Sequence, residues 1–144
     1  MQYGHFDDRA KEYVITRPDT PLPWINYLGN EGFFSLVSNT MGGYSFYKDA
    51  KLQRITRFRY NNVPADDGGR LFYICDGDTV WSPAFLPVRT PLDEYRCCHG
   101  LGYSVFEGLK NRVRAEVTVT VPMHTDMEVQ KLVLTNESST FYFF

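Results

Sequence analysis

The stretch VRAEVTVTV, residues 113–121, decides the fold class of this chain. Its apolar residues alternate with polar ones, and this period of two places all the apolar side chains on one face of a β-strand. Pro122 ends the run, because proline has no N–H to donate to a strand ladder. The apolar face consists of Val113, Ala115, Val117, Val119 and Val121. We therefore expect a half-buried strand here, with that face against a core.

Further strand-like runs lie on both sides of this segment, separated by turns rich in Gly, Pro and Asp. They cover residues 13–16, 24–28, 33–38, 54–60, 71–74 and 129–135, and residues 141–144 look like the start of another. Residues 4–8 look like an exposed lead-in, and glycines interrupt the segment 95–103. No convincing amphipathic helix is visible. The pattern predicts an all-β fold, an antiparallel β-sandwich in one domain over residues 1–144.

The bulk composition is that of a soluble globular protein. The formal net charge is -2, so we expect no general attraction to nucleic acid or to acidic membranes. The arginines in the run RITRFRY, residues 54–60, resemble a basic-aromatic nucleic-acid surface, but the overall acidity argues against that function. The polar N-terminus and the lack of a long apolar run predict a cytoplasmic protein without signal peptide or membrane span.

The cysteines predict free thiols and no metal site. Cys75, Cys97 and Cys98 are odd in number and two of them are adjacent, which disfavours a disulfide framework. His99 follows directly, but no third and fourth ligand can be identified for a metal ion.

Two other pairs of residues invite a functional interpretation. Asp7 and Asp8 are adjacent, and on an extended chain their side chains point to opposite sides, so they cannot act together as a catalytic pair of carboxylates. We expect them in a turn or in salt bridges. Trp24 and Trp81 are predicted to pack in a core or between domains, with sugar stacking as the alternative.

The strongest candidate for ligand binding is the stretch GGYSFYKDAKLQRITRFRYNN, residues 42–62. Its paired glycines predict a sharp turn, followed by an aromatic and charged loop. The aromatic members of this loop are Tyr44, Phe46 and Tyr47, and the polar members are Ser45, Lys48 and Asp49. Flat rings beside hydrogen-bonding groups suit a sugar ligand, whereas an ordinary hairpin with a packed aromatic face is the competing interpretation.

Several strings of the sequence, taken together, resemble one enzyme family. They are YGHFDD (3–8), EYVIT (12–16), PWINYLG (23–29), GGYSFYKDA (42–50), RYNN (59–62), DGD (76–78), WSP (81–83) and HGLGYS (99–104). In this order they are similar to the N-terminal region of the cellobiose phosphorylases. That family, glycoside hydrolase family 94 (formerly glycosyltransferase family 36), also includes cellodextrin and chitobiose phosphorylases.

The resemblance implies a fold and an activity. The fold would be a β-sandwich of the galactose-mutarotase-like supersandwich type, followed in the family by a large (α/α) helical barrel. The activity would be inverting phosphorolysis of a β-linked disaccharide, with cellobiose and inorganic phosphate giving α-glucose 1-phosphate and glucose. The general-acid Asp would lie on the barrel, phosphate would be a co-substrate, and no metal or organic cofactor would be needed.

For this chain the resemblance implies a truncated N-terminal domain of a cytoplasmic homodimer, with no catalytic residue of its own and no activity in isolation. Its role would be domain packing and dimerisation. Ser45, Tyr47, Lys48 and Asp49 would reach the rim of a catalytic pocket, in the same subunit or in the partner. A stand-alone carbohydrate-binding β domain is the rival hypothesis.

Overall fold

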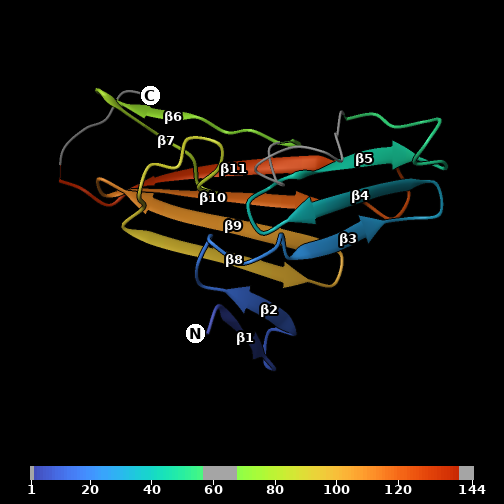
Figure 1. The fold of residues 1–144 in the computed structure, drawn as a ribbon, viewed down its shortest axis with the longest axis horizontal. Helices are drawn as coiled ribbons and strands as arrows, with labels where there is room; N and C mark the ends of the chain where they lie inside the picture. The colour runs from blue at the N-terminus through green and yellow to red at the C-terminus, as the bar shows by residue number, and fades with distance from the viewer. Residues whose placement is uncertain (1, 57–67, 140–144) are drawn as a thin grey trace.

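A computed structural model describes residues 2–56 and 68–139, and this part of the chain is built from β-strands alone. The all-β prediction is therefore confirmed (Figure 1). The strands are β1 (Gly4–Asp7), β2 (Glu12–Ile15), β3 (Ile25–Gly29), β4 (Phe33–Ser38), β5 (Gly43–Tyr47), β6 (Ile74–Asp76), β7 (Thr79–Trp81), β8 (Glu94–Gly100), β9 (Tyr103–Lys110), β10 (Val113–Thr120) and β11 (Val129–Asn136). No stretch of the described residues forms a helix long and apolar enough to cross a membrane.

A six-stranded antiparallel sheet in the order β1-β2-β8-β9-β10-β11 forms the larger layer. The alternation in residues 113–121 is realised in β10, where Val113, Ala115, Val117 and Val119 are completely buried. The β9–β10 hairpin turns through Asn111 and Arg112, whose positive φ angles of 49° and 63° match the twist of a two-residue hairpin loop.

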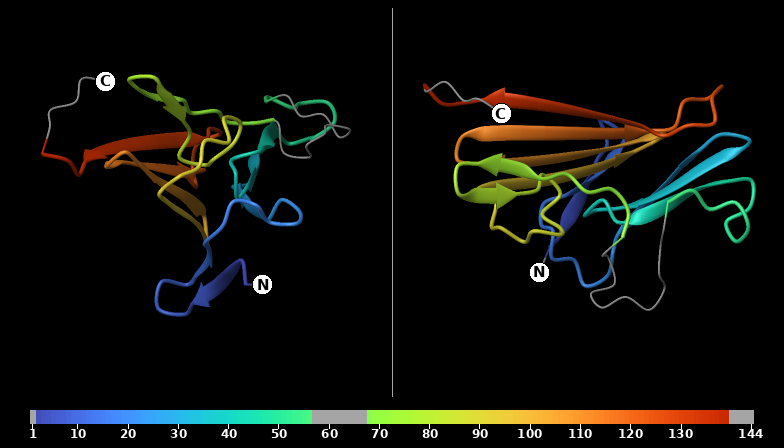
Figure 2. Two further views of the ribbon diagram at one scale, coloured as in Figure 1. Left: turned by 60° about the vertical axis from the view of Figure 1, so that its left-hand side comes forward. Right: turned by 90° about the horizontal axis from the view of Figure 1, so that it is seen from above.

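Two smaller sheets, β3-β4-β5 and β6-β7, cover the inner face of the six-stranded sheet (Figure 2). Val37 of β4 and Phe106 of β9 belong to one buried cluster between the layers. Trp81 of β7 is fully buried in a second cluster with Val113 and Ala115 of β10. The two-layer arrangement agrees with the predicted sandwich, and Trp81 packs in the core as expected.

Three local predictions are wrong. Residues 4–7 form the edge strand β1, in which Phe6 pairs with Tyr13, instead of an unpaired lead-in. Residues 71–73 are not a strand, and only Ile74 of the predicted run opens β6. The predicted loop after the glycines is strand β5 up to Tyr47, because its backbone pairs with β4.

The glycine-interrupted segment 95–103 covers most of β8 and the first residue of β9, with a tight turn between them. The predicted strand at 54–60 lies mostly outside the described residues, and within them Arg54 forms an isolated bridge to Phe46. The predicted strand start at 141–144 also lies outside the described residues.

A buried ion pair joins Arg70, in the segment before β6, to Glu128, which directly precedes β11. The side chains of Arg70 and Glu128 are 2% and 9% exposed, and the guanidinium donates to both carboxylate oxygens. Ser35 of β4 donates its hydroxyl to Glu128 at 2.5 Å and accepts a hydrogen bond from Arg70 at 2.6 Å. All three polar groups are therefore paired where water has little access.

Candidate functional site

Ser45, the first of the predicted binding residues, lies on the inward face of β5 and is 3% exposed. Its backbone N–H donates to Thr56 Oγ1 at 2.7 Å, and its carbonyl accepts from the N–H of Ile55 at 2.8 Å. The residue thus fastens the following loop to β5. The polar groups of Ser45 are therefore bonded within the chain and do not point toward a ligand.

Asp49 organises the turn after β5. Its Oδ1 accepts hydrogen bonds from the N–H groups of Lys51 and Leu52 at 2.8 and 2.7 Å, a side-chain-stabilised turn that aspartate commonly makes. Asp49 itself is exposed.

Tyr47 and Lys48 are the two predicted residues best placed to meet a ligand. Lys48 is exposed, and its Nζ lies 4.9 Å from the centre of the Tyr47 ring. Its backbone takes a φ of 58° and its N–H donates to the carbonyl of Gly32 at 2.8 Å. A left-handed lysine is costly unless its surroundings hold it, and this hydrogen bond holds the Lys48 backbone in that conformation.

A polar pocket of about 370 Å³ lies beside Tyr47. A Cβ added to Gly32, which lines this pocket, would come within 3.2 Å of the Tyr47 ring and 3.0 Å of Asp126 Oδ1. Glu31, His124 and Asp126 also line it, and they offer two carboxylates and an imidazole. Nothing in the sequence pattern pointed to these residues, because the turns that carry them are about ninety positions apart and meet only through the fold.

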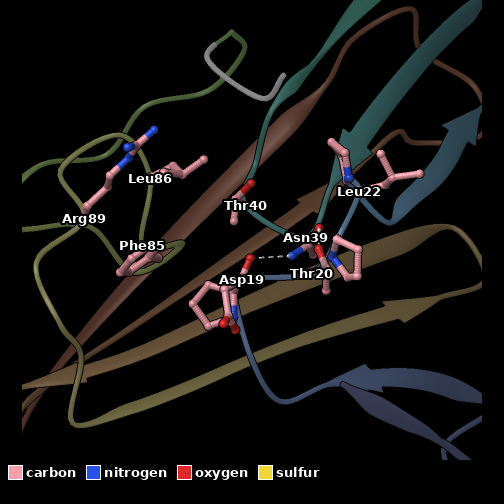
Figure 3. A pocket seen from close by; sticks show the side chains of 11 residues that line it. Asp19, Thr20, Leu22, Asn39, Thr40, Phe85, Leu86 and Arg89 are labelled. Carbon is pink, nitrogen blue, oxygen red and sulfur yellow. Dashed lines mark hydrogen bonds between the residues drawn. The ribbon is translucent and has the colours of Figure 1, made fainter. Parts of the chain in front are cut away.

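A second pocket, of about 340 Å³, opens between the proline-rich segment 18–23 and the loop 85–89 (Figure 3). Asn39 is 1% exposed and holds one wall, because its Oδ1 accepts from the N–H of Trp24 at 2.9 Å and from the Thr20 hydroxyl at 3.3 Å. Phe85 and Arg89 line the opposite wall with positive φ angles of 73° and 63°. Such backbone conformations in residues other than glycine often accompany ligand sites.

The chemistry of the second pocket suits binding better than acid catalysis. Its carboxylate, Asp19, bonds to the Arg17 guanidinium, with 2.9 Å between Nε and Oδ1. This hydrogen bond and the charge of Arg17 lower the pKa of Asp19, so the group stays ionised and is a poor proton donor. Hydroxyl, amide, guanidinium and aromatic groups remain to contact a ligand.

The WSP string is the sequence signal that leads to this pocket. Trp81, Ser82 and Pro83 are all buried, and a Cβ on Gly108 of β9 would lie 2.8 Å from the Cα of Pro83. The string therefore anchors the base of the loop 85–89 on the six-stranded sheet. It positions that wall and does not itself line the pocket.

His99 of β8 is half-buried, and both of its ring nitrogens have hydrogen-bond partners. Its Nε2 lies 3.1 Å from the carbonyl of Trp24, which can only accept, and its Nδ1 lies 2.9 Å from Ser104 Oγ. Nε2 therefore carries the proton, and Nδ1 accepts from the hydroxyl. Burial lowers the pKa of His99, against a smaller opposing effect of the hydrogen bond to the Trp24 carbonyl. Both ring nitrogens are committed, and no group of three or more potential ligands among the described residues is arranged to hold a metal ion.

Asp7 and the thiols of Cys97 and Cys98 have structural roles and not catalytic ones. Asp7 Oδ1 accepts from the N–H groups of Arg9 and Ala10 at 3.0 Å, so it caps the β1–β2 turn as expected. Cys97 and Cys98 are buried free thiols, and burial raises the pKa of Cys98 to about 11. Neither thiol is therefore activated as a nucleophile.

Comparison with known proteins shows which family the chain belongs to. The family profile described as "Glycosyl hydrolase 94, supersandwich domain" matches residues 11–141. An N,N'-diacetylchitobiose phosphorylase of Vibrio proteolyticus is 44% identical over 142 residues, which are 96% of this chain and 18% of that protein. The same enzyme of Vibrio furnissii is 43% identical over 142 residues, with the same shares. A solabiose phosphorylase of Paenibacillus borealis is 35% identical over 139 residues, 94% of this chain and 18% of that protein. The chain thus spans less than a fifth of the length of these relatives.

Proposed function

The chain belongs to glycosyl hydrolase family 94, as its N-terminal supersandwich region, and from this premise we propose that the intact protein is a disaccharide phosphorylase. The observation that carries the proposal is the match over residues 11–141 together with relatives that are disaccharide phosphorylases. The family likeness also supports a cytoplasmic homodimer, in which this region contributes packing, subunit contacts and one edge of the active site.

The substrate we propose first is N,N'-diacetylchitobiose. The two relatives that carry this name are 44% and 43% identical to the chain, against 34% and 35% for relatives named after a glucuronide and solabiose. Cellobiose, expected from the family resemblance, is the second candidate.

The mechanism we propose is inverting phosphorolysis. A carboxylic acid protonates the glycosidic oxygen while phosphate attacks the anomeric carbon from the opposite face, so the C–O bond to the leaving sugar breaks as the bond to phosphate forms. The proton goes to the leaving sugar, and the product is an α-sugar 1-phosphate. Neither of the two pockets described above supports assignment of the general acid, which we place outside residues 1–144. The chain alone is then inactive.

The substrate proposal is tested by kinetics of the intact protein with inorganic phosphate. We expect kcat/KM for N,N'-diacetylchitobiose to exceed that for cellobiose by at least about tenfold, since a site built to bond the acetamido groups leaves polar groups unpaired without them. A ratio in favour of cellobiose would contradict this choice of substrate and leave the phosphorylase assignment intact.

Lys48 is the predicted rim residue at which a substitution can distinguish a role in ligand binding from a structural role. In the intact enzyme, Lys48→Ala is expected to raise the KM for the sugar or for phosphate about tenfold, with little change in kcat, because a charged hydrogen bond to the ligand is lost. Lys51→Ala is the matched control, an exposed lysine three positions further along the same turn. If both variants keep the parent kinetics and stability, Lys48 has a structural role only.

A further inference from the structure

Beyond its part in a phosphorylase, we propose that this chain carries a separate, non-catalytic binding site for a neutral saccharide. The site is the groove between the β1–β2 hairpin and the β8–β9 turn. We call it the hairpin groove and define it by Phe6, Asp8, Lys11, Tyr13, Trp24 and Leu101. The hairpin lies at one side of the molecule (Figure 1), and Phe6, Asp8 and Lys11 of the groove are exposed.

The groove has room for sugar rings. Two hollows of about 430 and 460 Å³ adjoin along it, and they share Phe6, Tyr13 and His99 in their lining. Each falls within the size range of small-molecule sites, which run from about 300 to 1,000 Å³.

A row of aromatic rings forms the floor. Phe6 meets Tyr13 edge to face with 4.8 Å between ring centres, and Tyr13 lies 5.6 Å from Trp24. The β1–β2 register places Phe6 opposite Tyr13, so the strand pairing itself builds the row. Phe6 is 77% exposed, so its ring is accessible to a ligand. The C–H faces of a pyranose pack well on such rings.

The polar groups at the rim include an acceptor and a donor that the fold does not use. Asp8 and Lys11 make no hydrogen bond or ion pair with any other residue that the structure describes, and both line the groove. Glu12 and His99 are by contrast occupied, because Glu12 accepts from the Tyr103 hydroxyl at 2.7 Å and both His99 nitrogens are bonded. Asp8 and Lys11 are therefore the groups available to bond sugar hydroxyls.

The charge of the groove selects a neutral ligand. Asp7, Asp8 and Glu12 line it with Lys11 as the opposing charge, so the local balance is negative. Phosphate, uronates and nucleic acid would be repelled, whereas a neutral sugar hydroxyl can donate to a carboxylate and accept from an ammonium group. A neutral oligosaccharide is therefore the ligand that fits the aromatic rings, the available polar groups Asp8 and Lys11, and the negative local charge.

The test is a saccharide titration of the 144-residue chain, which measures binding and not turnover. It therefore does not depend on the phosphorylase proposal. The sequence holds two tryptophans, Trp24 in the groove and the fully buried Trp81, so a ligand-induced change in emission reports on Trp24. The probes are cellotetraose, N-acetylchitotetraose and, as the anionic comparison, tetragalacturonate.

We expect at least one neutral tetrasaccharide to change Trp24 emission and the anionic one to leave it unchanged. Phe6→Ala should weaken the affinity about tenfold, the effect of losing one stacking ring. Tyr73→Ala is the matched control, since it removes a ring that is 55% exposed and lies outside the groove. Asp8→Asn should also weaken binding, and it keeps the side-chain volume.

Three results would overturn the proposal. One is no change in Trp24 emission with either neutral probe. The second is equal loss of affinity in Phe6→Ala and Tyr73→Ala, which would place binding elsewhere or make it non-specific. The third is a change of sedimentation mass in Phe6→Ala with unaltered saccharide affinity, which would make the groove a contact between copies of the chain.

Discussion

Replacing Glu128 with Gln is expected to lower the free energy of unfolding by about 3 to 5 kcal/mol. The substitution keeps the shape of the side chain and removes the negative charge opposite Arg70. The Arg70 side chain is 2% exposed, so its guanidinium would remain buried without a counter-charge. Ser35 also loses a charged acceptor at 2.5 Å. The large cost comes from the uncompensated charge and not from the worth of the pair itself.

Urea unfolding at neutral pH, followed by the emission of the buried Trp81, measures this loss. Glu137→Gln is the matched control, because Glu137 bonds to Arg114 on the surface, where the two side chains are 37% and 25% exposed. An exposed ion pair contributes about 0 to 1 kcal/mol. Equal losses in the two variants would show that Arg70 and Glu128 are not buried together.

The same pair gives the chain a dependence on acid. Burial would raise the pKa of Glu128, but the hydrogen bond and charge of Arg70, with Ser35, bring that pKa below its usual value of 4.5. The unfolded chain then takes up this proton before the folded chain does. The stabilisation is therefore complete above about pH 4.5 and is lost as the pH falls toward the lower native pKa. Glu128→Gln should lose less stability than the parent over that interval.

Gly43→Ala is expected to destabilise the chain by about 3 kcal/mol or more. Gly43 has a φ of 118°, and a Cβ there would lie 2.1 Å from the carbonyl oxygen of Leu36. Because Val37 pairs with Gly43 and Leu36 with Tyr44, the added carbon would push into the backbone of β4. Relief of this clash would require β4 and β5 to separate.

Thermal and urea unfolding of the variants Gly43→Ala and Gly102→Ala distinguish the cost of the steric clash from the cost of the left-handed backbone alone. Gly102 also has a positive φ, of 86°, but a Cβ there meets no atom within 4 Å. Its substitution should cost about 1 kcal/mol, the usual penalty for a left-handed residue with a side chain. A similar small loss at Gly43 would mean that β4 and β5 are not paired in the described register.

The strands that the sequence predicted well, β4, β10 and β11, are rich in β-branched, aliphatic or aromatic residues. Strand β10 was predictable because four consecutive inward positions are Val or Ala, and the bounds of β4 agree with the predicted 33–38. Strand β9 was not predicted, because its inward positions include the small residues Ser104 and Gly108. Gly108 is small for a reason that only the fold reveals, since a Cβ there would lie 2.8 Å from the Cα of Pro83. Strand β1 was not predicted as a strand, because it is a short edge strand whose Phe6 is exposed and not in the core.

The candidate site was less predictable than the fold. Residue type alone made Ser45 and Asp49 look like ligand-binding groups. In the fold, Ser45 bonds to Thr56 and Ile55 of the following loop, and the Asp49 carboxylate accepts from backbone N–H groups of its own turn. The alternation in β5 turns Ser45 inward, a fact that a loop prediction could not contain. Lys48 and Tyr47 stay available at the strand end. Pocket residues such as Asp126 come from a distant turn, and their meeting depends on the whole chain.

The most direct test of the phosphorylase assignment is proton NMR of the intact protein incubated with N,N'-diacetylchitobiose or cellobiose, with and without inorganic phosphate. The assignment predicts cleavage that requires phosphate and a first product with the α-anomeric signal of a sugar 1-phosphate. Cleavage at the same rate without phosphate, with free sugars as the products, would show a hydrolase and contradict it.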